Sequence, residues 1–248
     1  MQNIGLLAIV VYVVSVHVRV AVGAGCVSPN TCITVSACAV KGGTSQPGLC
    51  PGSANIQCCK VTTGAVTEPI YTRLADLADI LRNAGLNVVE EPGWKTRGHG
   101  PMSSVKGILI HHTAGAATRD FPSLAVVRDG RPDLAGPLSQ LGLGRSGTWY
   151  VIAAGLSYHA GKTINDSIYG NANSIGIEAE GTGVPADTTG HKYWPEVQWQ
   201  SYVQGVKALQ AAYGVPTAQV LGHREAASPA GRKSDPNFSM DEFRAALG

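Results

Sequence analysis

Two adjacent histidines, His111 and His112, end a short apolar run in the stretch GILIHHTAG. Side chains alternate between the two faces of a β-strand, so these imidazoles point in opposite directions and only one can readily serve a site on a given face. Both faces of the run are apolar, and the alternation alone therefore does not choose between them. Two histidines that merely form hydrogen bonds at a strand end would give the same pattern.

Further residues able to do chemistry follow in two other segments. In SIGIEAE, alternation puts Glu178 and Glu180 on one strand face, which suits a cleft wall but also a solvated polar face. In LGHREAASPAGRKSDPNF, His223 ends a predicted strand, and a loop rich in proline and glycine then carries Lys233 and Asp235. Two histidines and an aspartate from separate loops match the three-ligand, open-position pattern of catalytic zinc, in which the vacant position holds the water to be activated.

The elements that must position these residues are predicted from periodicity. Apolar residues at helical spacing predict a helix over 70–84 that Gly85 ends, and another over 194–213 that begins around Pro195 and ends at Gly214. A terminal helix follows a capping Ser239. Strands are predicted at 86–89, 105–112, 148–154, 174–180 and 218–225. Because strands and helices interleave, we expect an α/β sheet with helices packed on it.

Taken together, the motifs resemble the type-2 N-acetylmuramoyl-L-alanine amidases, a zinc-dependent family that includes phage endolysins, bacterial anhydro-muropeptide amidases and animal peptidoglycan recognition proteins. The resemblance is nearest to actinobacteriophage endolysins and covers residues from about 68 to 248. It implies a central mixed β-sheet with helices packed on it, and hydrolysis of the amide bond between the lactyl group of N-acetylmuramic acid and L-alanine in peptidoglycan. The matching strings are EEPGWKTRGHG, ILIHHTAG, GPLSQLGLGRSGTWYVIAAGLSYHAGK, NSIGIEAEGTG, VLGHRE and GRKSDPNF.

The resemblance also implies a role for each matching residue. It makes His111, His223 and Asp235 the ligands of a Zn²⁺ ion. Glu178 matches the catalytic glutamate, which takes a proton from the attacking water, and Lys233 matches a catalytic lysine that stabilises the oxyanion. One departure is the segment between His223 and Asp235, which is two residues longer than in the anhydro-muropeptide amidases and must bulge.

Other residues near these motifs have weaker assignments. His159 in HAG matches a cleft residue that contacts substrate, although a buried histidine that orients a loop is the alternative. His112 is expected to contact substrate or to be a packing and hydrogen-bonding neighbour of the site, and Glu180 is expected to be structural. Some relatives place a catalytic tyrosine before the second strand, but neither Trp149 nor Tyr150 aligns with it, so both are expected in the core or cleft wall.

The first 60 residues differ in character from the rest. An apolar run over 4–16 precedes the small residues AVGAG, which predicts a secretory signal peptide over 1–25. The run is shorter than the roughly 20 residues of a membrane-spanning helix, and an uncleaved anchor extending to Val22 or a lipoprotein signal at GAGC are the alternatives. All six cysteines then lie between 26 and 59, which predicts a disulfide-rich module over 26–60 with 15 conceivable pairings.

The resulting organisation is a signal peptide, a module over 26–60, a linker over 61–67 and a zinc amidase domain over 68–248. The net charge of +2 and 6% aromatic content argue against nucleic acid as a partner. We therefore expect a secreted, monomeric, antibacterial protein whose partner is peptidoglycan. A peptidoglycan-binding protein without catalysis and an inert disulfide-rich secreted protein are the alternatives. The module resembles those of secreted cell-wall hydrolases in fungi, and either wall binding or a spacer role would suit it.

Overall fold

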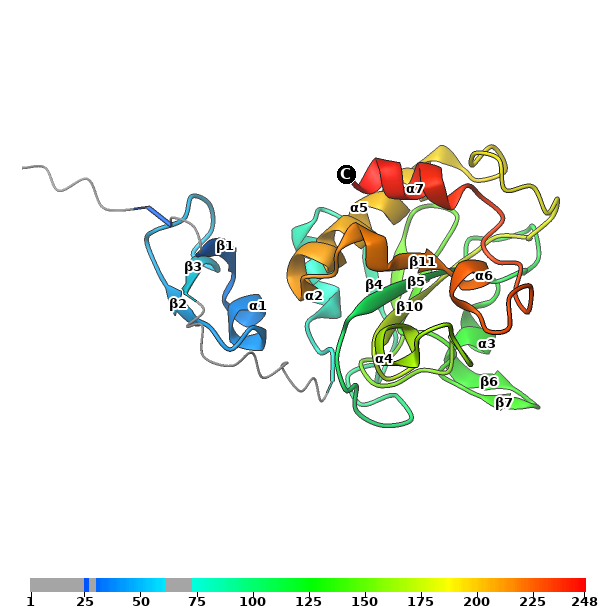
Figure 1. The fold of residues 1–248 in the computed structure, drawn as a ribbon, viewed down its shortest axis with the longest axis horizontal. Coiled ribbons are helices and arrows are strands. Elements are labelled where there is room, and N and C mark those ends of the chain that lie inside the picture. Colours follow the sequence, from blue (N-terminus) through cyan, green and yellow to red (C-terminus); the bar gives the residue numbers. More distant parts are fainter. Residues whose placement is uncertain (1–24, 27–29, 61–72) are drawn as a thin grey trace, which may run out of the picture.

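The computed structural model describes residues 25–26, 30–60 and 73–248. These form a small N-terminal module and a larger domain built around a six-stranded sheet (Figure 1). The predicted signal peptide, apart from its last residue, and the predicted linker over 61–67 lie outside the described residues.

The N-terminal module is an antiparallel sheet with one short helix. Its strands run in the order β1 (Thr31–Thr34), β3 (Ile56–Lys60), β2 (Thr44–Gln46), and α1 (Val35–Val40) follows β1. Such a segment buries little apolar surface, and each disulfide adds about 2–4 kcal/mol of stability by constraining the unfolded chain. The structure selects one pairing of the six cysteines: Cys26–Cys58, Cys32–Cys50 and Cys38–Cys59.

The larger domain contains a mixed sheet, as the resemblance implies. Neighbouring strands β11, β5, β10 and β8 are parallel, β9 is antiparallel to β8, and β4 is parallel to β9. The strands, in their order across the sheet, are β11 (Val220–Gly222), β5 (Gly107–His112), β10 (Ser174–Ala179), β8 (Leu141–Leu143), β9 (Trp149–Val151) and β4 (Val88–Glu90).

Strands β5 and β10 bury both faces against different partners. Ile108 and Ile177 belong to the main core, which the long helix α5 (Glu196–Tyr213) covers. Leu109 packs on the opposite face, in a smaller cluster with Tyr169. By the alternation of a strand, Leu109 shares its face with His111, while His112 shares the face of the main core.

Three helices of the described residues pack on the main core. Two of them, α5 and α7, begin or end at the residues that the sequence predicts. Helix α5 begins after Pro195, which occupies its N-cap, and ends at Gly214 with φ of 71°. Helix α7 (Met240–Leu247) begins at Ser239, whose hydroxyl accepts a hydrogen bond from the amide of Glu242. The third is α2 (Leu77–Asn83). Among the described residues, none of the helices is long and apolar enough to cross a membrane.

Some predicted elements differ from those observed. Of the helix predicted over 70–84, residues 70–72 lie outside the described part of the chain, residues 73–76 are not helical, and α2 covers only Leu77–Asn83. The strand predicted over 218–225 ends at Gly222, and His223 instead begins α6 (His223–Ala226). Strand β8 was not predicted, because Leu-Gly-Leu has no strong strand preference. The remaining unpredicted elements of the larger domain are α3 (Leu124–Asp129), β6 (Gly130–Arg131), β7 (Leu134–Ala135), α4 (Asp166–Tyr169) and the 3₁₀ helix η1 (Thr217–Gln219).

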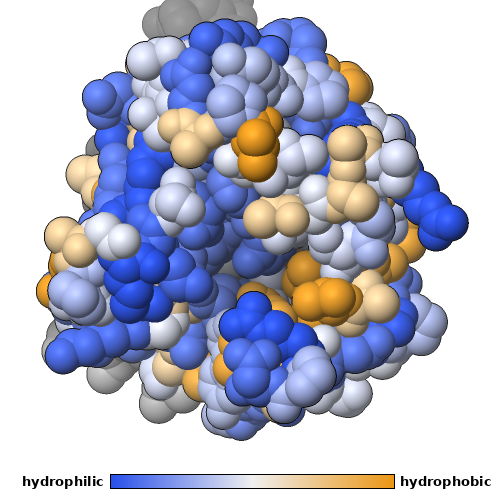
Figure 2. Space-filling view, turned by 90° about the vertical axis from the view of Figure 1, so that its right-hand side faces the viewer, coloured by the Kyte–Doolittle hydropathy of each residue, from blue (hydrophilic) through white to orange (hydrophobic). Residues whose placement is uncertain are grey.

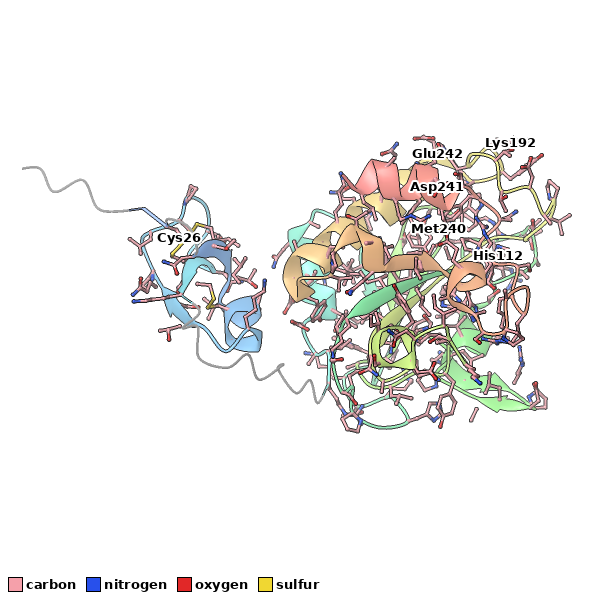
Figure 3. The ribbon with its side chains drawn as sticks, viewed as in Figure 1. Cys26, His112, Lys192, Met240, Asp241 and Glu242 are labelled. Atoms are coloured by element: carbon pink, nitrogen blue, oxygen red, sulfur yellow. A yellow bond between two sulfur atoms is a disulfide. The ribbon has the colours of Figure 1, made fainter. Side chains whose placement is uncertain are left out.

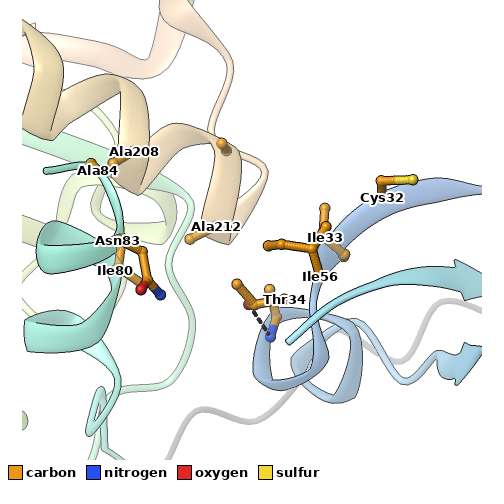
Figure 4. Close-up of a pocket in the computed structure, with 11 residues that line it drawn as sticks. Cys32, Ile33, Thr34, Ile56, Ile80, Asn83, Ala84, Ala208 and Ala212 are labelled. Atoms are coloured by element: carbon orange, nitrogen blue, oxygen red, sulfur yellow. Dashed lines mark hydrogen bonds between the residues drawn. The ribbon is translucent and has the colours of Figure 1, made fainter. Parts of the chain in front are cut away.

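An apolar pocket of about 260 Å³ lies where the N-terminal module faces the larger domain (Figure 4). Ile33 and Ile56 line it from the module, and Ile80 of α2 and Ala212 of α5 line it from the domain. These side chains border open space rather than packing together as a core does.

Candidate metal and catalytic site

The pairing of β5 with β10 brings the first two predicted residues together. Glu178 and His111 are directly opposed in the parallel ladder, and both point away from the main core. His111 Nδ1 lies 4.0 Å from Glu178 Oε1. Strand alternation alone did not show which of His111 and His112 faces this group. In the structure, only His111 shares a sheet face with Glu178.

Two later segments bring the other predicted ligands to the same place. His223 begins α6, immediately after β11, which is hydrogen-bonded to β5. The following loop returns to α6, where the amide of Arg224 donates to the carbonyl of Asp235 at 2.7 Å and its guanidinium donates to the carbonyls of Pro236 and Phe238. These contacts fix the position of the Asp235 carboxylate beside the two imidazoles.

The three side chains converge on one point. Asp235 Oδ2 lies 3.0 Å from His111 Nδ1 and 3.2 Å from His223 Nδ1. One ligand atom from each residue lies within 4.8 Å of the other two. Two imidazoles and a carboxylate form the donor set of many catalytic zinc sites. His223 also donates its Nε2–H to the carbonyl of Ala160 at 3.0 Å, which turns Nδ1 toward Asp235 as the atom that would bind a metal.

The protonation states of His111 and Asp235 favour the binding of a cation. Burial, reinforced by the nearby His223, lowers the pKa of His111 to about 4, so its ring is neutral and able to bind a metal at physiological pH. Burial alone would raise the pKa of Asp235, but hydrogen bonds with His111 and His223 outweigh it and hold that pKa well below its ordinary range. The Nε2 atom of His111 is buried and has no hydrogen-bond partner among the described residues. The residues therefore fit a divalent metal.

Glu178 differs from an ordinary surface carboxylate. Burial, together with the charge of Asp235, raises its pKa from 4.5 to about 8. Its Oε2 atom is buried without a hydrogen-bond partner among the described residues. A desolvated carboxyl group beside a ligand cluster is suited to accept and return a proton.

Glu180 lies beyond the end of β10 and has a different environment. Its fully buried carboxylate accepts hydrogen bonds from the hydroxyl of Thr113 at 2.6 Å and from the amide of Ser123 at 3.0 Å. Arg145 lies 3.7 Å away. These contacts hold the loop that follows β5, which agrees with the expected structural role.

The other predicted residues lie at different distances from the cluster. His159 is buried, with its ring centroid 5.5 Å from that of His111, and its Nε2–H donates to the carbonyl of Ser174. Lys233 is exposed and lines a pocket together with His159. His112, labelled in Figure 3 near α6, points toward the main core and accepts a hydrogen bond from the amide of Asn237 at 3.1 Å.

The two aromatic residues without a catalytic assignment lie away from the ligands. Trp149 is fully buried in the core and donates to the hydroxyl of Ser201. The hydroxyl of Tyr150 donates to Asp120 at 2.9 Å. Sequence reasoning did not include Arg232, whose guanidinium donates to the carbonyl of Ala160, the same group that orients His223. Residue types alone carry no sign of such a shared backbone acceptor.

A sequence model of the family described as N-acetylmuramoyl-L-alanine amidase matches residues 101–238, which is more than half of the chain. The chain belongs to this family. The match includes all three candidate ligands, Glu178 and Lys233 of this amidase. No curated protein matches the chain at a significant level.

Several solved structures are similar to this amidase. An endolysin amidase, LysCS from Clostridium intestinale URNW, is 20% identical, with 65% of this chain and 95% of that chain covered and a TM-score of 0.45. AmiD from E. coli, in complex with anhydro-N-acetylmuramic acid-L-Ala-D-gamma-Glu-L-Lys, is 22% identical, with coverages of 64% and 65% and a TM-score of 0.44. A Drosophila PGRP-LB mutant in complex with tracheal cytotoxin is 21% identical, with coverages of 63% and 99% and a TM-score of 0.41.

Proposed function

We propose that the protein is a zinc-dependent peptidoglycan hydrolase that cleaves the amide bond between the lactyl group of N-acetylmuramic acid and L-alanine of the stem peptide. The observation that carries this proposal is the convergence of His111, His223 and Asp235 within ligand distance, next to the largely desolvated Glu178. Family membership supplies the reaction class. A recognition protein without catalysis would need no such proton acceptor beside the ligands.

The three ligands would hold the zinc ion, which when bound supplies a Lewis acid that lowers the pKa of water and favours the ionised form of Glu178. The Glu178 carboxylate then accepts the proton of the attacking water and donates it to the departing alanine amine. The ammonium group of Lys233 stabilises the negative charge that develops on the carbonyl oxygen. The carbonyl of Ala160 keeps the His223 ring in one orientation during turnover.

We also propose that the chain is exported, with residues 1–25 as a signal peptide, 26–60 as the module, 61–67 as a linker and 68–248 as the amidase domain. Three disulfides within 26–59 support an oxidising compartment. We propose that His159 lies at or beside the substrate, and that the protein acts as a monomer. For His112, which lies on the opposite sheet face from His111 and is bonded to Asn237, we propose the other expected role, that of a packing and hydrogen-bonding neighbour of the site. The N-terminal sequence of the exported protein tests the cleavage site.

Mass spectrometry of muropeptides after digestion tests the reaction. We expect peptides with a new free N-terminal alanine, and we expect a chelator to abolish them and added zinc to restore them. The matched control is the Glu178→Gln variant, which keeps the ligands and should bind zinc without turnover. Fragments cut at any other bond, or unchanged cleavage in the chelator, would contradict the proposal.

A further inference from the structure

The three candidate ligands differ in what holds them in place. His111 lies in the central strand β5, and His223 begins α6 directly after β11, so regular secondary structure fixes both residues. Asp235 belongs to an irregular segment between α6 and α7. Because such a segment has no ladder or helical hydrogen bonds of its own, the position of this carboxylate depends on contacts with its surroundings.

The segment that carries Asp235 meets a second loop. This loop covers residues 181–194, between β10 and α5. Figure 1 shows both segments on the side of the domain that carries α6. The surface on that side is hollowed near its centre (Figure 2). Contacts between the two segments can therefore affect the geometry of the candidate site.

The side chain of Asn237 joins the two segments. Asn237 is 4% exposed, and its Oδ1 accepts a hydrogen bond from the indole N–H of Trp194 at 3.1 Å. Its Nδ2 donates to the carbonyl of Pro185 at 2.9 Å. Buried amide groups without partners destabilise a fold, and here both ends of the amide have one. The side chain thus holds the ligand segment against the 181–194 loop at two points.

The backbone around Asn237 is bonded to other elements. Its amide donates to Nδ1 of His112 at the end of β5, at 3.1 Å. The carbonyls of the residues before and after it accept hydrogen bonds from the guanidinium of Arg224. The next side chain, Phe238, is fully buried, and its ring centroid lies 5.1 Å from that of Trp194. Asn237 therefore connects the ligand segment both to β5 and to the 181–194 loop.

We propose that Asn237 is a positioning residue for the zinc ligand Asp235. The inference rests on the proposed function, because it takes Asp235 as a ligand of zinc. The hydrogen bonds of Asn237 fix the backbone that carries the carboxylate before the ion arrives, so zinc binding does not include the entropic cost of ordering the segment. Loss of a group that orients a ligand commonly weakens metal binding by about 10–100-fold.

The test is the zinc affinity of the full-length protein, measured by competition with a chromogenic chelator. In Asn237→Ala we expect the Kd for zinc to rise about tenfold, the lower end of that range, because Asn237 acts on the ligand through the backbone. This measurement does not depend on turnover, and it needs no substrate.

A second variant, Trp194→Phe, tests the same contact from the other side. Phenylalanine keeps an aromatic ring beside Phe238 and removes the N–H that Asn237 accepts. We expect the Kd for zinc to rise about threefold, in line with the loss of one hydrogen bond between neutral groups. Because both substitutions remove this bond, their effects should not add, and the double variant should bind zinc about as tightly as Asn237→Ala.

The matched control is Ser239→Ala, which lies in the same part of the chain and removes the hydrogen bond that caps α7. It should lower the thermal stability and leave the Kd for zinc unchanged. If Asn237→Ala also lowered the stability but left the Kd unchanged, its role would be structural and the proposal would be overturned.

Two further outcomes decide the matter in other cases. If Asn237→Ala did not fold, Trp194→Phe would serve alone, and an unchanged Kd in that variant would overturn the proposal. If the unmodified protein bound no zinc, the proposed function itself would fail, which is distinct from a failure of the role of Asn237.

Discussion

Replacing Glu178 by glutamine should abolish turnover and, in the metal-free protein, stabilise the fold at neutral pH. The side chain is 18% exposed, and its burial holds the pKa at about 8. Glutamine has nearly the same shape and no charge to lose. The substitution therefore removes the free-energy cost of ionising a desolvated carboxyl group and leaves the packing of the side chain nearly unchanged.

The size of the effect follows from proton linkage. Because the folded-state pKa of Glu178 exceeds its ordinary value of 4.5, the unfolded chain releases this proton first, and the metal-free protein loses stability as the pH rises from 4.5 to about 8. Each pH unit within this window costs about 1.4 kcal/mol, and the free energy of unfolding should fall by about 2.5 kcal/mol between pH 5 and pH 7 on account of Glu178. The Glu178→Gln variant avoids this loss.

Thermal unfolding of both proteins in a chelator, at pH 5 and pH 7, measures the difference. For a domain of this size, the Tm advantage of the variant should be about 5–10 °C larger at pH 7 than at pH 5. Comparing the two pH values cancels any constant effect of the substitution, and His111 and Asp235 titrate in both proteins. A Tm difference that is independent of pH would show that Glu178 is ionised at no cost and would refute the burial argument.

Three further substitutions test other contacts. Asp235→Ala should lose zinc in elemental analysis of the purified protein, and a full zinc equivalent would contradict its role as a ligand. Gly205→Ala would place a Cβ atom 2.1 Å from the Trp149 ring and should cost about 1–3 kcal/mol in denaturant unfolding, whereas an unchanged midpoint would contradict this close packing. Ser239→Ala removes the hydroxyl that caps α7 at Glu242 and should cost about 1 kcal/mol by the same assay; no change would show that the cap contributes nothing.

The alternation of side chains predicted which residues of β10 share a sheet face. It separated Glu178 from Ile177, as the structure confirms. It could not choose between His111 and His112, because β5 is a central parallel strand whose two faces are both buried, so both faces have apolar residues. The sheet face opposite α5 carries His111 and Glu178. It could be identified only once the pairing of β5 with β10 was known. At the level of sequence, only the resemblance to the amidases favoured His111 over His112 as the ligand.

Backbone contacts account for most of what the sequence did not indicate. The carbonyl of Ala160 orients His223 and binds Arg232, but a carbonyl is present in every residue and leaves no pattern. The end of β11 at Gly222 also escaped prediction, since VLGHRE continues with residues that suit either a strand or a helix. One disulfide pairing among many likewise depends on how the short strands meet, which cysteine spacing does not specify.

The direct opposition of His111 and Glu178 across the β5–β10 ladder limits how the gene can change. Inserting or deleting a single codon within either strand would turn one of these side chains to the other side of the sheet and separate the pair. The exposed stretch from Pro229 to Gly231 is less restricted, since it precedes Lys233 and contacts on either side of it set the position of Asp235. We therefore expect length variation among descendants of this sequence to accumulate in that stretch and to be purged from the two strands.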